Sequence, residues 1–414
     1  MKLILVGAGN RGLDVYAKHL KTHHPEIEFV GVADPSEHQQ SRFKALYSHN
    51  EVKIFDSWET ILNEPKFADA AIIATQDDMH FEPTMKALAQ GYHVLLEKPI
   101  TGNKEELIKL REYAKEQNKI LSIAHVLRYS SFFATIKSLL IQGKIGHVRS
   151  IQHQENIGFY HYAHSFVRGP WHDSNTSNPI ILAKACHDMD IIAWYVESKC
   201  TRVSSFAIQN TLTKDNKPIG AVKRCTDGCP HQDTCVYFAP RLYQTTKAEH
   251  LKNILENQFG SLNHALTTSD YGRCVYDMEN NVMETQVTLL QFENGVQVTF
   301  HLSAFSDEIS RYIHIMGTEG EIRANTIENQ IIVKRFDQEY EDIIEIKEFD
   351  SAHQGGDAGI VRGFVQEVQN SDFENGRTTI DKSIMSHLMA LAAEESRKTN
   401  KIIHMDEFEK EGQH

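Results

Sequence analysis

Three glycines near the start of the chain have the spacing that suits a bound diphosphate. Gly7, Gly9 and Gly12 form the pattern G-x-G-x-x-G, with Asn10 and Arg11 between the last two. The first glycine allows a tight turn, the second lets backbone approach a pyrophosphate, and the third lets a helix pack on the preceding strand. The N–H groups at the start of that helix attract phosphate. The segment therefore predicts a dinucleotide site.

An acidic residue at the end of the next expected strand indicates which dinucleotide binds. Asp34 comes about 20 residues after the glycines, where a carboxylate accepts hydrogen bonds from ribose hydroxyls. No Arg or Lys occupies the next few positions to receive the 2′-phosphate of NADP. The sequence therefore favours NAD, the alternative being a glycine-rich turn in another kind of α/β protein.

A lysine follows another expected strand, in the tripeptide Glu97-Lys98-Pro99. The carboxyl end of a parallel strand faces the crevice where such sheets bind ligands. An amine there can relay a hydroxyl proton or polarise a carbonyl. We therefore interpret Lys98 as catalytic, the alternative being a capped loop.

The segment Ile180–Val196 is apolar nearly all round, so a buried helix is expected. Lys184, His187 and Asp188 share one stripe of it. Burying Lys and His without a purpose is costly, so the stripe indicates a helix that lines a cavity. His187 is then a candidate acid or base, and Lys184 a second catalytic or substrate-binding group. The alternative is a surface Lys184–Asp188 pair beside a structural histidine.

A loop rich in aromatic residues, 159–171, precedes this helix. Aromatic faces take the C–H surfaces of a sugar, while Arg and His take hydroxyls or a carboxylate. The side chains that best suit such a subsite are His164, Arg168 and Trp171. His125 and Glu155 fit it as well, and each of these residues is as readily structural.

Three cysteines, Cys225, Cys229 and Cys235, lie close together in a polar insert spanning about 210–285, and Cys274 adds a fourth. Such a set fits a structural zinc site that holds a weak loop together. An iron–sulfur cluster and free thiols are the alternatives. Cys186 and Cys200 are expected to be core thiols.

The elements that position the dinucleotide motifs alternate between strand and helix. The expected strands are Lys2–Val6, Glu28–Ala33, Ala70–Thr75, His93–Glu97 and Ile120–Ala124. The helical patterns between them are Leu13–Lys21, His80–Gln90 and Lys104–Gln117. This rhythm predicts an α/β domain, a Rossmann doubly wound parallel sheet over residues 1–124.

Residues 125–414 have a different pattern, which predicts an α+β substrate-binding and oligomerisation domain with an open, mostly antiparallel β-sheet. The expected strands are Val148–Gln154, Arg202–Ile208, Gln286–Glu293 and Val296–Ser303. Asn294-Gly295 between the last two predicts a tight hairpin. Two helices, Ala358–Gln369 and Asp381–Arg397, follow. A sheet with few helices nearby predicts a homodimer or homotetramer formed through it.

Composition bounds the class of protein. The chain has 414 residues, 41% of them hydrophobic, and a net charge of -13. It is long enough for two domains. Since it shows no basic stripe and no apolar run of membrane-spanning length, we expect neither nucleic acid nor a membrane as partner. No signal peptide is expected, which predicts a cytoplasmic protein with reduced cysteines.

Together these motifs closely resemble those of the Gfo/Idh/MocA family of sugar and polyol oxidoreductases, over nearly the whole chain. The residues that carry the resemblance are Gly7–Gly12, Asp34, Ala74-Thr75, His80, Glu97-Lys98-Pro99, Arg128-Tyr129 and Ile141–Val148. It implies that Lys98 faces both nicotinamide and substrate, that Glu97, Thr75 and His80 belong to the cofactor site, and that Arg128 sits at the mouth of the substrate site.

The resemblance extends to the second-domain helix, with one departure. The family has His followed three residues later by Asp, matched here by His187 and Asp190, which implies that His187 acts on the substrate hydroxyl. Many members also carry Asp four residues before this His, where this chain has Ala183, followed by Lys184. The departure indicates that Lys184 recognises an acidic or acetylated sugar, or supplies another acid–base group.

The function that these residues predict is hydride transfer between NAD and a hydroxyl or carbonyl carbon of a sugar, sugar acid or cyclitol. A second hypothesis is an NAD-dependent glycosidase or epimerase, in which oxidation is transient and no net NADH forms. A third is a non-catalytic NAD(H)-sensing protein, which explains the polar stripe on the buried helix poorly.

Overall fold

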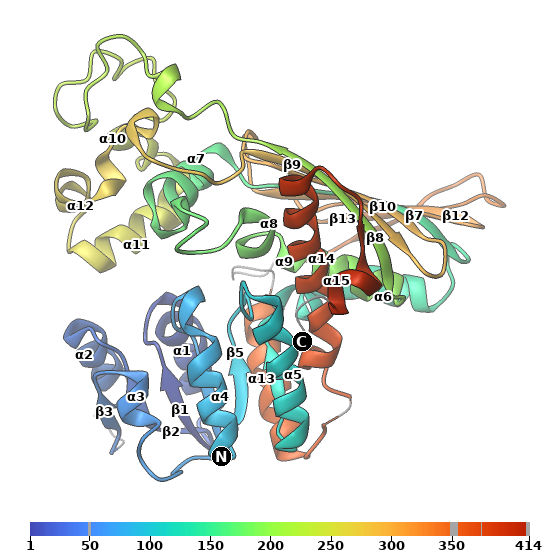
Figure 1. Ribbon diagram of the computed structural model, residues 1–414, viewed down its shortest axis with the longest axis horizontal. Coiled ribbons are helices and arrows are strands. Elements are labelled where there is room, and N and C mark those ends of the chain that lie inside the picture. Colours follow the sequence, from blue (N-terminus) through green and yellow to red (C-terminus); the bar gives the residue numbers. More distant parts are fainter. Residues whose placement is uncertain (49–50, 348–354, 374, 411–414) are drawn as a thin grey trace.

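The computed structural model describes residues 1–48, 51–347, 355–373 and 375–410. Its N-terminal half is a six-stranded, fully parallel sheet in the order β3-β2-β1-β4-β5-β6, in the lower part of Figure 1. The strands are β1 (Lys2–Val6), β2 (Glu28–Ala33), β3 (Lys53–Phe55), β4 (Ala70–Ile73), β5 (His93–Leu96) and β6 (Leu121–Ile123). The strand order reverses between β1 and β4, where sheets of this kind bind ligands. The expected Rossmann fold is confirmed.

Helices flank this sheet. They are η1 (Asn10–Ala17), α1 (Lys18–His23), α2 (Glu37–Leu46), α3 (Trp58–Ile61), η2 (Asp77–Met79), α4 (Phe81–Ala89) and α5 (Lys104–Glu116). Side-chain oxygens of Ser36 and Asn103 accept N–H bonds at the N-termini of α2 and α5, as good N-caps do. The sequence analysis did not predict β3, because a three-residue strand is too short to show a period.

The second half contains a nine-stranded sheet in the order β14-β13-β12-β11-β7-β10-β9-β8-β15. Its strands are β7 (Val148–Asn156), β8 (Cys200–Ile208), β9 (Thr285–Phe292), β10 (Gln297–Ser303), β11 (Ser310–Gly317), β12 (Gly320–Asn325), β13 (Gln330–Arg335), β14 (Asp342–Glu345) and β15 (Ile403–His404). The β9–β10 hairpin turns at Gly295, with φ of 83°, as predicted. The pair β7–β10 is parallel, and the long connection that parallel strands require is provided by the helices between β7 and β8, since β8, β9 and β10 then follow as antiparallel neighbours.

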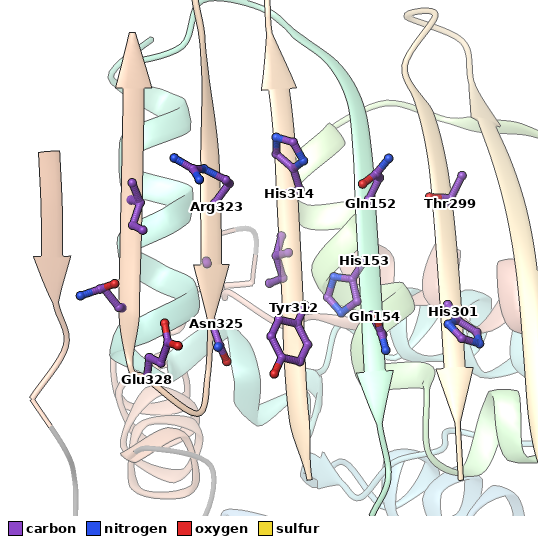
Figure 2. A pocket seen from close by; sticks show the side chains of 14 residues that line it. Gln152, His153, Gln154, Thr299, His301, Tyr312, His314, Arg323, Asn325 and Glu328 are labelled. Atoms are coloured by element: carbon purple, nitrogen blue, oxygen red, sulfur yellow. The ribbon is translucent and has the colours of Figure 1, made fainter. Parts of the chain in front are cut away.

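The two faces of this sheet differ. Helix α9 (Cys186–Val196) and helix α14 (Ile380–Thr399) pack on the inner face, and residues of β10 alternate strictly between buried and exposed. The outer face is hollowed by a cavity of about 460 Å³ lined by polar side chains, including His301, Tyr312 and His314 (Figure 2). This cavity faces away from the inner helices, so it is not where the two halves meet.

The remaining helices all follow β6 in the chain. They are η3 (Val126–Tyr129), α6 (Ser131–Ile141), α7 (Phe159–Tyr162), η4 (Ala163–Arg168), η5 (Pro170–His172), α8 (Ile180–Ala183), η6 (Lys214–Asn216), α10 (Ala239–Leu242), η7 (Thr246–Ala248), α11 (Glu249–Phe259), α12 (Leu262–Thr268), η8 (Asp270–Gly272), η9 (Val275–Asp277), α13 (Gly356–Gln369) and α15 (Met405–Lys410). No helix within the described ranges is long and apolar enough to cross a membrane. The insert forms its own helical lobe, at upper left in Figure 1, around a small second core.

The C-terminal part of the chain returns to the nucleotide-binding half. Helix α13, drawn in orange in the lower part of Figure 1, packs against β5 and η1, and the Thr378 carbonyl accepts the Ile123 N–H of edge strand β6. A division of the chain at residue 124 does not describe this return. The consequence is that acidic and histidine side chains of α13 and α14 reach the dinucleotide half.

One such contact joins the loop after β5 to helix α14. The Ile100 N–H donates to Nε2 of His387 at 2.9 Å, so this nitrogen carries no proton. Burial, and then the nearby His125, lower the pKa of His387 to about 3. Protonation of His387 would remove the acceptor that holds this loop.

We therefore expect His387 to make the fold acid-sensitive. Below about pH 6.5 the unfolded chain binds a proton at this histidine that the folded chain excludes, so the free energy of unfolding falls by about 2 kcal/mol down to pH 5. The variant His387→Gln keeps a carbonyl acceptor for Ile100 and cannot titrate. Urea unfolding at pH 7 and pH 5 should show a smaller acid loss for His387→Gln than for wild type or for the exposed-site control His38→Gln. An equal loss in all three would contradict this account.

Candidate active site

The glycine loop has the geometry that a diphosphate requires. Gly7 has φ of 90°, and a Cβ on it would lie 2.4 Å from the Ala74 carbonyl oxygen. A Cβ on Gly12 would lie 2.0 Å from the Gly7 oxygen, so Gly12 allows η1 to pack closely. A Cβ on Gly9 would meet no atom of the described residues within 4 Å. The open space beside Gly9, at the N-terminus of η1, therefore fits an approaching pyrophosphate.

Asp34 lies against the same loop. Its carboxylate accepts the Ala8 N–H at 2.8 Å and the Ser36 N–H at 2.9 Å. It ends β2 beside the end of β1, where a ribose would continue from the glycine loop. A 2′-phosphate at this place would meet a carboxylate, so the arrangement fits NAD rather than NADP.

The Arg11 side chain turns away from the loop into a buried cluster. Its guanidinium binds Glu97 at 2.7 Å, Asp357 of α13 at 2.7 Å and the Tyr16 hydroxyl at 2.7 Å. Leaving buried carboxylates unpaired costs about 3–5 kcal/mol, more than one exposed phosphate contact returns. We therefore expect only backbone of Asn10 and Arg11, and not the Arg11 guanidinium, to face the cofactor.

This cluster fixes Glu97 next to the candidate catalytic lysine. Burial acts to raise the pKa of Glu97, but the Arg11 charge outweighs it and the pKa is lowered, so Glu97 stays ionised. One Glu97 oxygen also accepts the Lys98 N–H at 3.1 Å. The backbone of Lys98 is thereby held at the end of β5.

The Lys98 amine reaches across to the second half. Its Nζ donates to the Ala183 carbonyl at 2.9 Å. The segment 180–196 is not the single helix that we expected, since α8 ends at Ala183 and α9 begins at Cys186. In a continuous helix the Ala183 carbonyl would accept the His187 N–H. The break frees this carbonyl for Lys98 and places the amine one turn before His187.

Thr75 and His80 brace the loop that carries Lys98. His80 bonds the Pro99 carbonyl through Nδ1 at 2.6 Å and approaches the Thr75 carbonyl with Nε2 at 3.3 Å. The Thr75 hydroxyl donates to the Met79 carbonyl at 2.7 Å. Both residues lie at the carboxyl edge of the parallel sheet, where the cofactor would pass, and His80 supports the loop from behind.

Buried histidines of the second half surround Lys98. Burial lowers the pKa of His161 well below its usual range, helped by the charges of Lys184, His164, His250 and Lys98. Burial, with Arg128 and Lys98, does the same for the pKa of His125, whose ring lies 5.7 Å from that of His187. Burial raises the pKa of the adjacent Cys186 thiol to about 12, so it is not a nucleophile at neutral pH. The structure thus gathers Lys98 and His187 in one region.

Lys184 is held by a carboxylate that the sequence analysis noted only in passing. Its Nζ pairs with the fully buried Glu155 of β7 at 3.1 Å. Glu155 also pairs with Arg311, which binds Asp188 at 2.7 Å. A surface Lys184–Asp188 pair is therefore wrong, because Asp188 is fully buried and bonded to Arg311 and to His153. This ionic cluster fixes the start of α9.

The Arg128 side chain is not exposed at the entrance of the substrate site. It forms a two-pronged pair with Asp190, at 2.7 Å for both contacts, and donates to the carbonyls of Arg377 and Lys382. All of its guanidinium nitrogens are thus used within the fold. The geometry indicates that Arg128 and Asp190 together orient α9 from the side opposite the sheet.

The side chains of the aromatic loop 159–171 do not all point toward one substrate subsite, although the sequence predicts that they do. His164 bonds the Tyr243 hydroxyl at 2.8 Å and Arg168 binds carbonyls of the insert, so both point into the insert lobe. Trp171 donates to Asp77 of the first half at 3.1 Å. His161, which we did not single out, is instead influenced by the charges of Lys184 and Lys98, and its buried Nδ1 lacks a hydrogen-bond partner within the described residues. The π-helical winding of η4, which no sequence period reveals, separates His161 from His164.

Comparison with known proteins agrees with this geometry. The family model for the NAD-binding Rossmann fold of the oxidoreductase family GFO_IDH_MocA matches residues 1–125, and that for its C-terminal alpha/beta domain matches residues 137–405. The chain is 26% identical over 334 residues to YteT of Bacillus subtilis (strain 168), covering 78% of this chain and 76% of YteT. It is 27% identical over 207 residues to scyllo-inositol 2-dehydrogenase (NAD(+)) of the same organism, covering 49% of this chain and 56% of that protein.

Solved structures show the same fold. Scyllo-inositol dehydrogenase from Lactobacillus casei, with bound NAD(H) and scyllo-inositol, superposes with a TM-score of 0.67 at 18% identity and covers 98% of this chain and 99% of its own. An oxidoreductase from Agrobacterium radiobacter, in complex with NAD+, L-tartaric acid and magnesium, superposes with a TM-score of 0.70 at 13% identity, covering 98% and 99%.

The open space at Gly9 yields a prediction about cofactor binding. A methyl group in Gly9→Ala clashes with no protein atom but occupies the approach of the pyrophosphate. We expect the melting temperature to stay unchanged while the Kd for NAD, measured by calorimetry, rises at least about tenfold, or 1.4 kcal/mol. The matched variant Gly12→Ala should instead destabilise the fold, because its Cβ would collide with the Gly7 carbonyl. Wild-type NAD affinity in Gly9→Ala would contradict the assigned cofactor site.

Proposed function

The chain belongs to the GFO_IDH_MocA oxidoreductase family and is an NAD-dependent dehydrogenase, and from this premise we propose that its substrate is a sugar, sugar acid or cyclitol. The proposed reaction moves a hydride between NAD and a hydroxyl or carbonyl carbon of that substrate. The observation that carries this proposal is the Lys98 amine, which leaves the nucleotide half and bonds the Ala183 carbonyl just before His187.

Each group at this junction has a role consistent with its surroundings. When bound, NAD accepts or donates the hydride at its nicotinamide ring. Lys98 holds the reacting oxygen by a hydrogen bond, and His187 takes the hydroxyl proton as general base or returns it in the reverse direction. We assign the Nδ1 of His161, which has no hydrogen-bond partner within the described part of the chain, to a second substrate hydroxyl. We assign Lys184, which pairs with Glu155 and whose charge lowers the pKa of His161, to another oxygen of the same ligand.

The inositol dehydrogenases among the relatives support a polyhydroxylated substrate. A ligand of that class presents several hydroxyls, which suits a site built from amines and imidazoles rather than from apolar side chains. The choice among cyclitols, sugars and sugar acids is open to a direct screen.

Replacement of Lys98 tests the proposed chemistry. Lys98→Ala should lower kcat by about 10²–10⁴-fold on the best substrate of a cyclitol, sugar and sugar-acid panel, since general acid–base groups contribute on that scale. The Kd for NAD should stay within a few-fold. Lys109→Ala, an exposed lysine on α5, is the matched control and should retain wild-type kcat.

Two outcomes of this assay would contradict the proposal. Unchanged turnover in Lys98→Ala would remove the lysine from the chemistry. Product formed without an equal amount of NADH would indicate a glycosidase or epimerase that recycles NAD in place.

We also propose that the protein self-associates through the outer face of the large sheet. Exposed apolar residues on this face include the cross-strand neighbours Phe206 and Val287, Leu289 on the same strand as Val287, and Tyr312 on β11, three strands away. A second copy would remove this apolar surface from water. Figure 2 shows the polar side chains that flank it, which supply hydrogen bonds at such an interface.

A charge on this face should break the assembly. Leu289→Glu places a carboxylate among the apolar residues, and light scattering after size exclusion should show a shift from oligomer to monomer. Ile141→Glu, on the exposed end of α6, is the control and should keep the wild-type mass. A monomeric wild type, or an unchanged mass in Leu289→Glu, would refute this interface.

A further inference from the structure

The insert brings together four cysteines that the dehydrogenase chemistry does not use. Cys225, Cys229, Cys235 and Cys274 line one cavity of about 20 Å³, at some remove in sequence from every proposed catalytic residue. Backbone bonds from Cys225 to Gly272 and from Cys274 to Lys223 hold two of them on paired segments. All four are free thiols in the structure.

The segment around these cysteines has almost no core of its own. Of residues 217–236 only Cys225 is buried, and Ile219 and Val236 are largely exposed. The regular features of this stretch are turns and one isolated β-bridge, from Arg224 to Arg273. A segment that buries so little apolar surface requires another source of order, and in proteins a disulfide or a bound metal commonly supplies it.

A buried arginine faces the same cavity. Arg168 is 3% exposed, and its guanidinium binds the carbonyls of Arg273 and Tyr237, both at 2.7 Å, with Cys225 Sγ at 3.8 Å. Among the residues that the structure describes, its Nη1 has no hydrogen-bond partner of good geometry, although the Tyr243 hydroxyl is nearby. All of these partners are neutral. A buried cation without a counter-charge is costly, so the cavity is expected to carry negative charge.

We propose that Cys225, Cys229, Cys235 and Cys274 bind one structural Zn²⁺ ion. Four thiols would release four protons as the ion binds, leaving a site with two net negative charges beside Arg168. A cavity of about 20 Å³ has room for a single ion. No group of three or more ligands in the described part of the chain is already posed for a metal, so the ion gathers the thiols by rotation about χ1.

The ion would also stabilise one wall of the active site. Arg168 ends η4, the segment that follows His161, and Trp171 ties the next turn to Asp77 of the nucleotide half. A rigid insert therefore holds this segment from the far side. The proposal does not rest on the identity of the substrate or on the hydride transfer.

Metal analysis of the untagged, full-length protein tests the proposal. Mass spectrometry of the acid-digested protein should find about one zinc and no stoichiometric iron per chain. Cys229→Ser and Cys274→Ser should lose the zinc, while Cys200→Ser, which alters a core thiol of β8, should keep it. Iron with matching sulfide would overturn the single-ion site, and so would metal-free protein, with six titratable thiols or with disulfides.

Cobalt provides a readout that does not depend on the folding of variants. Wild-type protein in which Co²⁺ replaces the native ion should show thiolate-to-cobalt charge transfer in the near ultraviolet and the visible bands of tetrahedral cobalt. Octahedral cobalt spectra, or no bound cobalt, would also overturn the proposal.

Discussion

The structure depends on a buried carboxylate that must stay paired. Glu97 ends strand β5, and its charge is balanced by Arg11 from the glycine loop, which in turn pairs with Asp357 of α13. Three distant parts of the chain are thereby locked at the carboxyl edge of the parallel sheet. The Glu97 carboxylate also accepts the backbone N–H of Lys98. The cofactor loop, the C-terminal helix α13 and the residue that carries the reactive amine are thus connected through Glu97 and its ion pair.

A second ionic cluster performs the equivalent task in the other half. Arg311 links Asp188 on α9 to Glu155 on β7, and Glu155 holds Lys184 at the break between α8 and α9. On the opposite side of α9, Arg128 forms an ion pair with Asp190. Buried ion pairs of this kind add little net stability but penalise any other arrangement. Their effect here is to present His187 and the free Ala183 carbonyl to Lys98 in one orientation.

Local patterns predicted much of this, and the rest lay in contacts that no local pattern contains. The glycine spacing, Asp34, the strand before Lys98 and the Asn294-Gly295 hairpin follow from short-range backbone physics, and the structure has all of them. One partner of Arg11, Asp357, lies 346 residues away, so no local sequence pattern shows that the Arg11 side chain turns away from the cofactor. The break after Ala183, the π-winding of η4, and the contacts of His164 and Arg168 with the insert are likewise absent from any local pattern.

A ternary crystal structure with NAD and the best cyclitol or sugar substrate tests the central claim most directly. The account predicts a substrate carbon about 3–3.5 Å from the hydride-accepting nicotinamide carbon, with its hydroxyl contacting both Lys98 Nζ and His187. Substrate bound elsewhere, or a nicotinamide ring placed away from Lys98, would contradict it.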